Sequence, residues 1–326
     1  MLKPAVFVAL FIAAWLAQNQ AVERHRDHFQ AYGDYNAMIN EVQSDQPFPR
    51  WLIGASVLSS TYQVADYLAD LDAARFIYRS SMLWPLVAGI GILLIFPSWA
   101  SYMALTCPML LLFSSGYSEY YPYISPIFVA VALAHLNGRF DGLAAWTTGT
   151  LCSLLFLVYV GFLPLACIIG CYALARRPQA AIPLVGSALL TLVVVSLALS
   201  GPGYFSQMFH DLNTGDLPSY PEQDGWAMPG TPFFWPAKAA ESFPGLLSAI
   251  SRGVGIGPML AACVLALHDR RLAVLMGVYV VVSVFTIPRL GWLGDTDLFF
   301  QLYILGGLSI GSAIDASVNA REGVLP

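Results

Sequence analysis

The residues in this sequence that could do chemistry are acids standing next to long apolar runs. Glu119 lies within residues 115–122, between two such runs, and tyrosines flank it on both sides. A carboxylate is costly to bury in hydrocarbon, so an acid at this place normally contacts water, a cation or a polar cavity. Tyrosine is enriched where a membrane meets water. Glu119 therefore indicates either a polar or cation-binding site at a membrane surface or a solvated turn between two spans.

Asp295 and Asp297 form a second acidic pair, separated by one threonine. Two carboxylates at this spacing can supply oxygen ligands to a divalent cation. The same residues can also begin a helix, because the free N–H groups and the helix dipole favour negative charge there. Asp34, which follows Gly33, fits either a general base or an ordinary turn. The residue types leave both alternatives open for each acid.

The composition indicates the environment that these acids share. Hydrophobic residues make up 57% of the chain and charged residues only 11%. Soluble proteins have roughly 25% charged residues. The mean hydropathy is +0.65, and the apolar residues are grouped in blocks. We therefore predict an integral membrane protein that contacts the lipid bilayer and has no nucleic-acid partner.

Ten apolar runs are candidates for membrane-spanning helices. Several are shorter than the roughly 20 residues that an untilted span needs, so their ends must extend into polar flanks. We predict an all-α polytopic bundle of about ten transmembrane helices, forming one integral membrane domain over residues 1–326. The runs are 4–17, 82–96, 102–113, 123–135, 143–159, 162–174, 181–199, 254–267, 272–287 and 298–313.

Two long polar regions are predicted to form loops on one side of the membrane. In the first loop, apolar residues recur near helical spacing over 61–78, which predicts an amphipathic helix on the membrane surface. The predicted layout is a first span (1–18), the first extracytoplasmic loop (19–79), spans two to seven (80–200), a second large extracytoplasmic loop (201–253), the last three spans (254–315) and a cytoplasmic tail (316–326).

The basic residues orient these spans. If Lys3 is cytoplasmic and the chain crosses alternately, the short cytoplasmic segments hold seven of the 15 Lys and Arg but only four of the 20 Asp and Glu. The positive-inside rule favours this orientation, with both termini in the cytoplasm. Asp34, Glu119, Asp295 and Asp297 then all emerge on the extracytoplasmic face.

The layout and three short motifs resemble the C-type glycosyltransferase superfamily, whose members take a sugar from a polyprenyl-phosphate carrier. Gly33-Asp34 is similar to the first-loop acid of a group of multi-spanning bacterial members. The segment Gly-Tyr-Ser-Glu-Tyr-Tyr at 116–121 resembles their Gly-Tyr-x-Glu-x-Tyr stretch. The segment Asp-Thr-Asp-Leu-Phe at 295–299 resembles their Asp-x-Asp-Leu-Phe stretch.

The resemblance implies an inverting sugar transfer from a polyprenyl-phosphate donor to a glycan, lipid or protein acceptor of the cell envelope, at the extracytoplasmic face of a bacterial inner (plasma) membrane. Asp34 would be the catalytic base. Glu119 would help to hold either the donor phosphate or a divalent cation, magnesium or manganese, for which Asp295 and Asp297 would be further ligands. The phosphate-linked donor would contact Lys238, Arg289 and Tyr120. Lys238 can instead extend its charge to the membrane interface without binding a ligand.

Two other classes of function remain open at the level of sequence. In an ion-coupled transporter or flippase, Glu119 and the Asp295/Asp297 pair would bind the coupling ion. Transporter sites usually lie near the bilayer midplane between repeated halves, whereas these acids are predicted at one face and the sequence shows no internal repeat. The third class is a non-catalytic membrane subunit of a glycan assembly complex.

Overall fold

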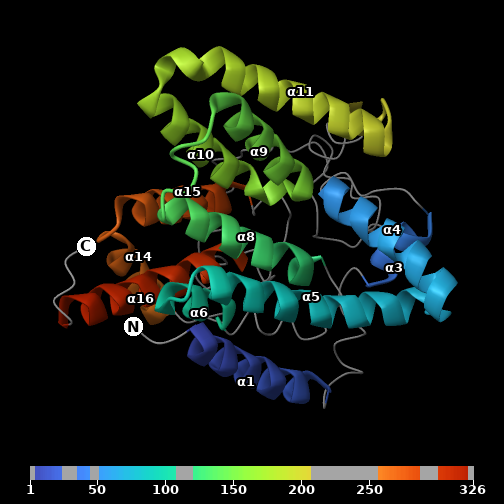
Figure 1. Cartoon of the computed structure of the whole chain (residues 1–326), viewed down its shortest axis with the longest axis horizontal. Helices are drawn as coiled ribbons and strands as arrows, with labels where there is room; N and C mark the ends of the chain where they lie inside the picture. The colour runs from blue at the N-terminus through green and yellow to red at the C-terminus, as the bar shows by residue number, and fades with distance from the viewer. Residues whose placement is uncertain are drawn as a thin grey trace. The chain divides into compact units, whose positions relative to one another are not determined.

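The computed structural model is all-helical over the residues that it describes, which are 4–23, 35–44, 51–107, 120–206, 256–286 and 300–321. No strand occurs in these ranges, which confirms the all-α class. The helices shown in Figure 1 are α1 (Pro4–Glu23), α3 (Tyr35–Ser44), α4 (Leu52–Ala69), α5 (Ala73–Ile95), α6 (Trp99–Leu105), α8 (Tyr121–Leu136), α9 (Ala145–Val158), α10 (Leu163–Arg176), α11 (Ala181–Ser200), α14 (Ile256–Ala266), α15 (Arg270–Thr286) and α16 (Phe300–Arg321), with short 3-10 turns at Val160–Phe162 and Pro178–Ala180.

Each predicted apolar run overlaps a helix in the part of the chain that the structure describes. Two helical stretches there, Ala73–Ile95 and Pro178–Ser200, are long and apolar enough to cross a membrane by themselves. Shorter apolar helices of 10–17 residues occupy five further runs. A helix is therefore confirmed in each run where the structure describes it, although in 102–113 it ends at Leu105. The count of about ten spans stays a prediction.

The predicted amphipathic helix over 61–78 is wrong in its boundaries. α4 ends immediately before Asp70, whose backbone is left-handed with φ of 48°, and α5 begins at Ala73. Residues 73–79 are thus continuous with the apolar part of α5 and do not belong to a separate surface helix.

Aspartates explain why the helix is interrupted between α4 and α5. The Asp70 N–H donates to the Asp66 carbonyl at 3.1 Å, which closes the end of α4. Asp72 Oδ1 accepts the N–H of Arg75 at 2.7 Å, which satisfies a free donor at the start of α5. Aspartate tolerates the left-handed conformation better than most residues. Helical periodicity does not reveal the break, because polar residues at these positions also suit the exposed face of a continuous helix.

The chain divides into two compact units, which are described separately. Unit 1 comprises Met1–Tyr35, Tyr78–Leu133 and Phe234–Pro326, and unit 2 comprises Asn36–Ile77 and Ala134–Phe233.

In unit 2, α9 and α11 pack closely through small and hydroxylated residues. A Cβ atom on Gly149 would lie 2.1 Å from the carbonyl oxygen of Leu184, so only glycine permits this approach. One turn further along both helices, Ser153 Oγ donates to the Ala188 carbonyl at 2.6 Å. The contacts advance in the same direction on both helices, which are therefore parallel. Small residues and interhelical hydroxyl bonds are typical of helix pairs in membranes.

An ion pair in unit 2 links two turns that were predicted to lie on the cytoplasmic side. The Arg176 guanidinium, at the end of α10, lies 2.8 Å from the Asp141 carboxylate in the turn after α8. The ends of α8 and α10 are therefore neighbours, which is compatible with their common predicted side.

In unit 1, α6 packs directly against two glycines of α16. A Cβ atom on Gly307 would lie 2.6 Å from the carbonyl oxygen of Met103, and one on Gly311 would lie 2.3 Å from that of Trp99. The two glycines are four residues apart and so share one helix face. The contacts run in opposite directions, so α6 and α16 are antiparallel.

Asp315 continues the same face of α16 by one more turn and caps α6. Its Oδ1 and Oδ2 atoms accept the backbone N–H groups of Trp99 and Ala100, each at 3.0 Å. These are among the first N–H groups of α6, which have no partner within their own helix. One carboxylate thus satisfies two donors and fixes the register of α6 on α16.

Candidate functional site at the start of α8

Tyr120 is the one predicted site residue within the described ranges. The predicted catalytic base Asp34, the predicted metal ligands Glu119, Asp295 and Asp297, and the predicted phosphate ligands Lys238 and Arg289 lie outside them.

Tyr120 stands at the entrance to α8. Its carbonyl oxygen accepts the N–H groups of Tyr123 at 3.0 Å and Ile124 at 3.2 Å, so its backbone already takes part in the first turn. Pro122 falls in that turn, where the missing N–H costs nothing because no partner would be available for it. Glu119 immediately precedes this helix start in the sequence.

The side chain of Tyr120 packs on its neighbour Tyr121. Their ring centroids are 4.6 Å apart, and the Tyr120 hydroxyl donates to the Tyr121 hydroxyl at 3.4 Å. Tyr120 is partly exposed, whereas Tyr121 is fully buried. The pair therefore presents one accessible ring supported by one fixed ring, which is compatible with Tyr120 contacting a ligand.

An aromatic cluster joins the start of α8 to α15 and α16. The rings of Tyr121 and Phe300 have centroids 5.2 Å apart, and Phe300 is the first residue of α16. Phe128 lies 6.2 Å from Phe300 and 5.4 Å from Tyr279 by the same measure. We call these residues, with Tyr120, the aromatic cluster. It places the starts of α8 and α16 side by side.

Two polar contacts hold the same turn of α8 against α5. Ser80 Oγ and Tyr123 Oη are 2.7 Å apart, and Trp84 Nε1 donates to the Tyr123 carbonyl at 2.9 Å. Both contacts satisfy polar groups that would be costly to leave alone among apolar side chains. The start of α8 is therefore fixed by α5 on one side and by α16 on the other.

The described residues around the start of α8 fix the position of this helix and supply few reactive groups. Within the described ranges, no group of three or more His, Cys, Asp and Glu side chains could hold a metal ion. The hydroxyls of Tyr120 and Tyr121 can form hydrogen bonds, but the acids required for proton transfer or cation binding belong to the flanking segments of the sequence.

Sequence reasoning missed the contact between Tyr121 and Phe300. A signal for it exists, because two adjacent aromatics closely follow each acidic segment: Tyr120 and Tyr121 directly after Glu119, and Phe299 and Phe300 one residue further on from Asp297. Paired aromatics are frequent at buried helix contacts because they bury large areas and favour specific ring geometries.

No protein-family model, curated protein or solved structure matches this chain. The candidate function therefore depends on the residues and the geometry given above.

Proposed function

We propose that this chain is an integral membrane glycosyltransferase that transfers a sugar from a polyprenyl-phosphate donor to an envelope acceptor at the extracytoplasmic face. The observation that carries the proposal is the contact between Tyr121 and Phe300, whose ring centroids are 5.2 Å apart. It joins the two helices that directly follow the two acidic segments of the sequence.

Short segments of sequence connect the acids to this aromatic contact. Glu119 comes two residues before Tyr121, and Asp297 comes three residues before Phe300. An extended chain spans at most about 3.6 Å per residue, so neither acid can be far from this contact. In the proposal, the carboxylates of Glu119, Asp295 and Asp297 face a common site beside the aromatic cluster.

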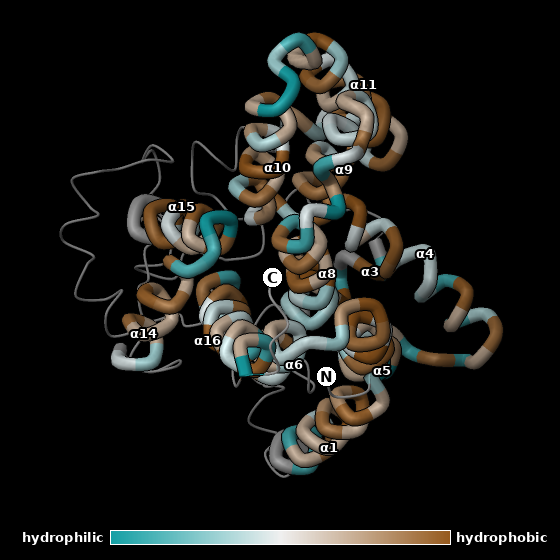
Figure 2. Tube along the Cα trace, turned by 60° about the vertical axis from the view of Figure 1, so that its left-hand side comes forward, coloured by the Kyte–Doolittle hydropathy of each residue, from teal (hydrophilic) through white to brown (hydrophobic). Residues whose placement is uncertain are grey.

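The exposed surface of α11 supports a membrane location. In Pro178–Ser200, the most apolar stretch has a mean hydropathy of 2.4, and only 11% of it is buried. Ile182 is 86% exposed and Leu190 is 65% exposed among the described residues. Figure 2 shows hydrophobic residues along α11 and hydrophilic ones in the turn before it. The core helix of a soluble protein would bury these side chains, whereas lipid can cover them.

The directions of packed helices also support the predicted topology. Alternate crossing requires α9 and α11 to be parallel and α6 and α16 to be antiparallel, as their contacts show within each unit. The ion pair between Arg176 and Asp141 adds a contact between two turns of one predicted side.

The proposed reaction uses each predicted residue in one role. Asp34 takes the proton from an acceptor hydroxyl, whose oxygen attacks the anomeric carbon of the donor sugar. The bond between that carbon and the phosphate oxygen breaks, and polyprenyl phosphate leaves with the electron pair. A divalent cation held by Glu119, Asp295 and Asp297 would neutralise the leaving phosphate. Lys238, Arg289 and Tyr120 bind the same phosphate end of the donor.

The proposal is tested by sugar transfer in proteoliposomes that contain the full chain and a synthetic polyprenyl-phosphate sugar. We expect Asp34→Asn to lower the transfer rate by about 100-fold or more, because a positioned base contributes at least that much. Asp45→Asn, which changes an acid of the same predicted loop, serves as the control and should retain activity.

Three results would contradict the proposal. Equal transfer by Asp34→Asn and wild type would exclude Asp34 as the base. Ion-dependent uptake that is lost in Glu119→Gln, without any sugar transfer, would identify a transporter. The absence of transfer and of uptake in the wild-type chain would favour a non-catalytic subunit.

A further inference from the structure

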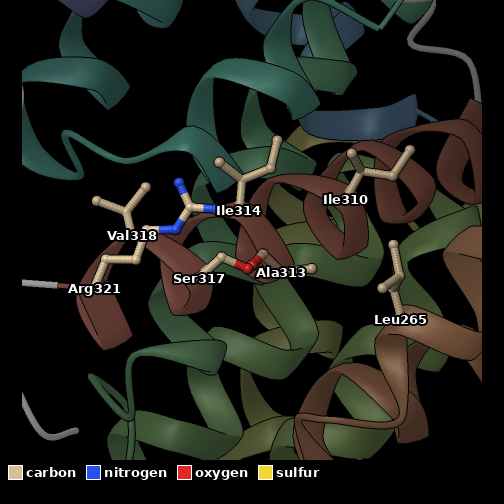
Figure 3. A pocket seen from close by; sticks show the side chains of 7 residues that line it. All are labelled: Leu265, Ile310, Ala313, Ile314, Ser317, Val318 and Arg321. Carbon is tan, nitrogen blue, oxygen red and sulfur yellow. The ribbon is translucent and has the colours of Figure 1, made fainter.

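A groove at one end of unit 1 combines apolar walls with a single cationic side chain. Its volume is about 340 Å³, and six of its seven lining residues come from the last four turns of α16. Figure 3 shows them together with Leu265 from α14. The lining residues are Leu265, Ile310, Ala313, Ile314, Ser317, Val318 and Arg321.

The groove has an apolar end and a charged end. Ile310 and Leu265 lie at one end of the groove, and Arg321 lies at the other. In Figure 3 the Arg321 side chain folds back along α16, so that its guanidinium lies between the side chains of Val318 and Ile314. An amphipathic molecule with an anionic head and a hydrocarbon tail matches this order.

Nearby acids do not neutralise Arg321 in the described ranges, where no ion pair includes it. On the same helix, Asp315 is engaged by the N–H groups of α6. In the turn before α15, Asp269 Oδ1 accepts the backbone N–H of Arg271 at 2.8 Å. Both carboxylates are thus committed to helix starts, so within the described ranges neither of them pairs with Arg321.

The packing of α14 on α16 brings more positive charge to the same end. Ala262 lies next to Gly306, and Leu265 lies in the groove beside Ile310, so the two helices are parallel. The basic pair Arg270 and Arg271 follows the end of α14. It therefore lies toward the end of the α14–α16 pair that carries Arg321.

The outer surface of α14 suits hydrocarbon. On α14, Leu260 and Val264 are 61% and 67% exposed, and Leu267, directly after the helix, is 72% exposed. The apolar groove adjoins this helix through Leu265. A lipid tail in the groove would therefore be continuous with a surface that already favours lipid.

We infer that the groove binds one anionic phospholipid, with an acyl chain along Ile310, Ala313 and Ile314 and the phosphate at Arg321. The inference rests on the membrane location in the proposed function but not on sugar transfer. The groove lies at the predicted cytoplasmic end, and the acids of the proposed reaction belong to the other side. Failure of the transfer assay would leave this binding site unaffected.

The test is native mass spectrometry of the full chain released from detergent micelles that contain equal amounts of phosphatidylglycerol and phosphatidylcholine. Wild type should retain phosphatidylglycerol preferentially. Arg321→Gln should reduce that preference by about fivefold, the effect expected for one basic residue at an anionic lipid surface. Arg321→Lys should keep most of it. Arg177→Gln, an exposed arginine of unit 2, is the matched control and should behave like wild type.

A second variant tests the groove separately from the charge. Ser317→Phe fills the groove from an exposed position and should reduce retention of phosphatidylglycerol. Ala316→Phe adds the same ring at the adjacent exposed position, which does not line the groove, and should not. Equal retention of both lipids by wild type, an unchanged preference in Arg321→Gln, or equal retention by the two phenylalanine variants would each overturn the inference.

Discussion

At the scale of single residues, the most consequential side chains are the aromatics that follow the acids. Tyr120 was predicted to contact the donor, and its partial exposure on a buried Tyr121 is compatible with that role. The sequence identified the acids because charge next to an apolar run is conspicuous. It did not identify Tyr121 and Phe300 as partners, because their pairing depends on two helices separated by more than half of the chain.

The contact between Tyr121 and Phe300 should have a measurable interaction energy. In a double-mutant cycle of Tyr121→Leu and Phe300→Leu, we expect the two substitutions to be coupled by about 0.5–1.5 kcal/mol, the usual value for a buried aromatic pair. The measurement is the free energy of unfolding in mixed micelles. Tyr121→Leu combined with Phe7→Leu, whose ring contacts Trp99 and Tyr102 instead, should show additive effects. Additivity of both pairs would contradict the described contact.

Asp315 carries a second prediction at this scale. Asp315→Asn leaves one oxygen to accept an N–H group and turns an NH₂ group toward the other, so α6 loses one of its two caps. We expect the free energy of unfolding to fall by about 1 kcal/mol or more, the typical cost of losing a helix cap. Ser317→Ala, on the exposed face of the same helix, should change it little. Equal stability of Asp315→Asn and wild type would show that the cap is not formed.

At the scale of elements, hydrophobicity predicted where helices form but not where every helix ends. The apolar runs overlap helices because their residues favour helix and must satisfy backbone groups internally in an apolar setting. The break at Asp70 escaped prediction because capping aspartates and exposed aspartates look alike in a periodic pattern. The close approach of α6 to α16 escaped it as well, since glycines at 307 and 311 reveal a contact only when the partner is known.

Replacing glycine by alanine should change the free energy of unfolding in opposite directions at different positions. Gly307→Ala and Gly311→Ala should each destabilise the protein, because the new Cβ would lie within 2.6 Å of a backbone oxygen of α6. Gly277→Ala, in α15 with open space around it, should instead raise the free energy of unfolding by about 0.5–1 kcal/mol through helix propensity. Gly306→Ala meets its nearest atom at 3.8 Å and should be tolerated. The same unfolding assay applies, and tolerance of Gly311→Ala would contradict the packing of α6 on α16.

At the scale of the whole molecule, the proposed site requires residues that are distant in the sequence to lie on one side of the membrane. The charge distribution predicted that side, and the directions of helix pairs within each unit agree with it. The described contacts cannot be derived from hydropathy, because a bundle with the same spans can be assembled in many neighbour orders. The contact between the starts of α8 and α16 establishes one pair of neighbours in that order. The proposed site requires this pair.

The most direct test of the central claim measures whether the acidic segments before α8 and α16 meet. Glu119→Cys and Asp297→Cys, introduced into a chain whose five native cysteines are replaced, should be joined by a short bifunctional maleimide in the membrane. Glu119→Cys with Asn319→Cys is the control, because position 319 lies about 28 Å further along α16 from Phe300. Efficient cross-linking of the first pair alone is the predicted result. Failure of the first pair, under conditions in which each cysteine reacts with a simple maleimide, would contradict the shared site.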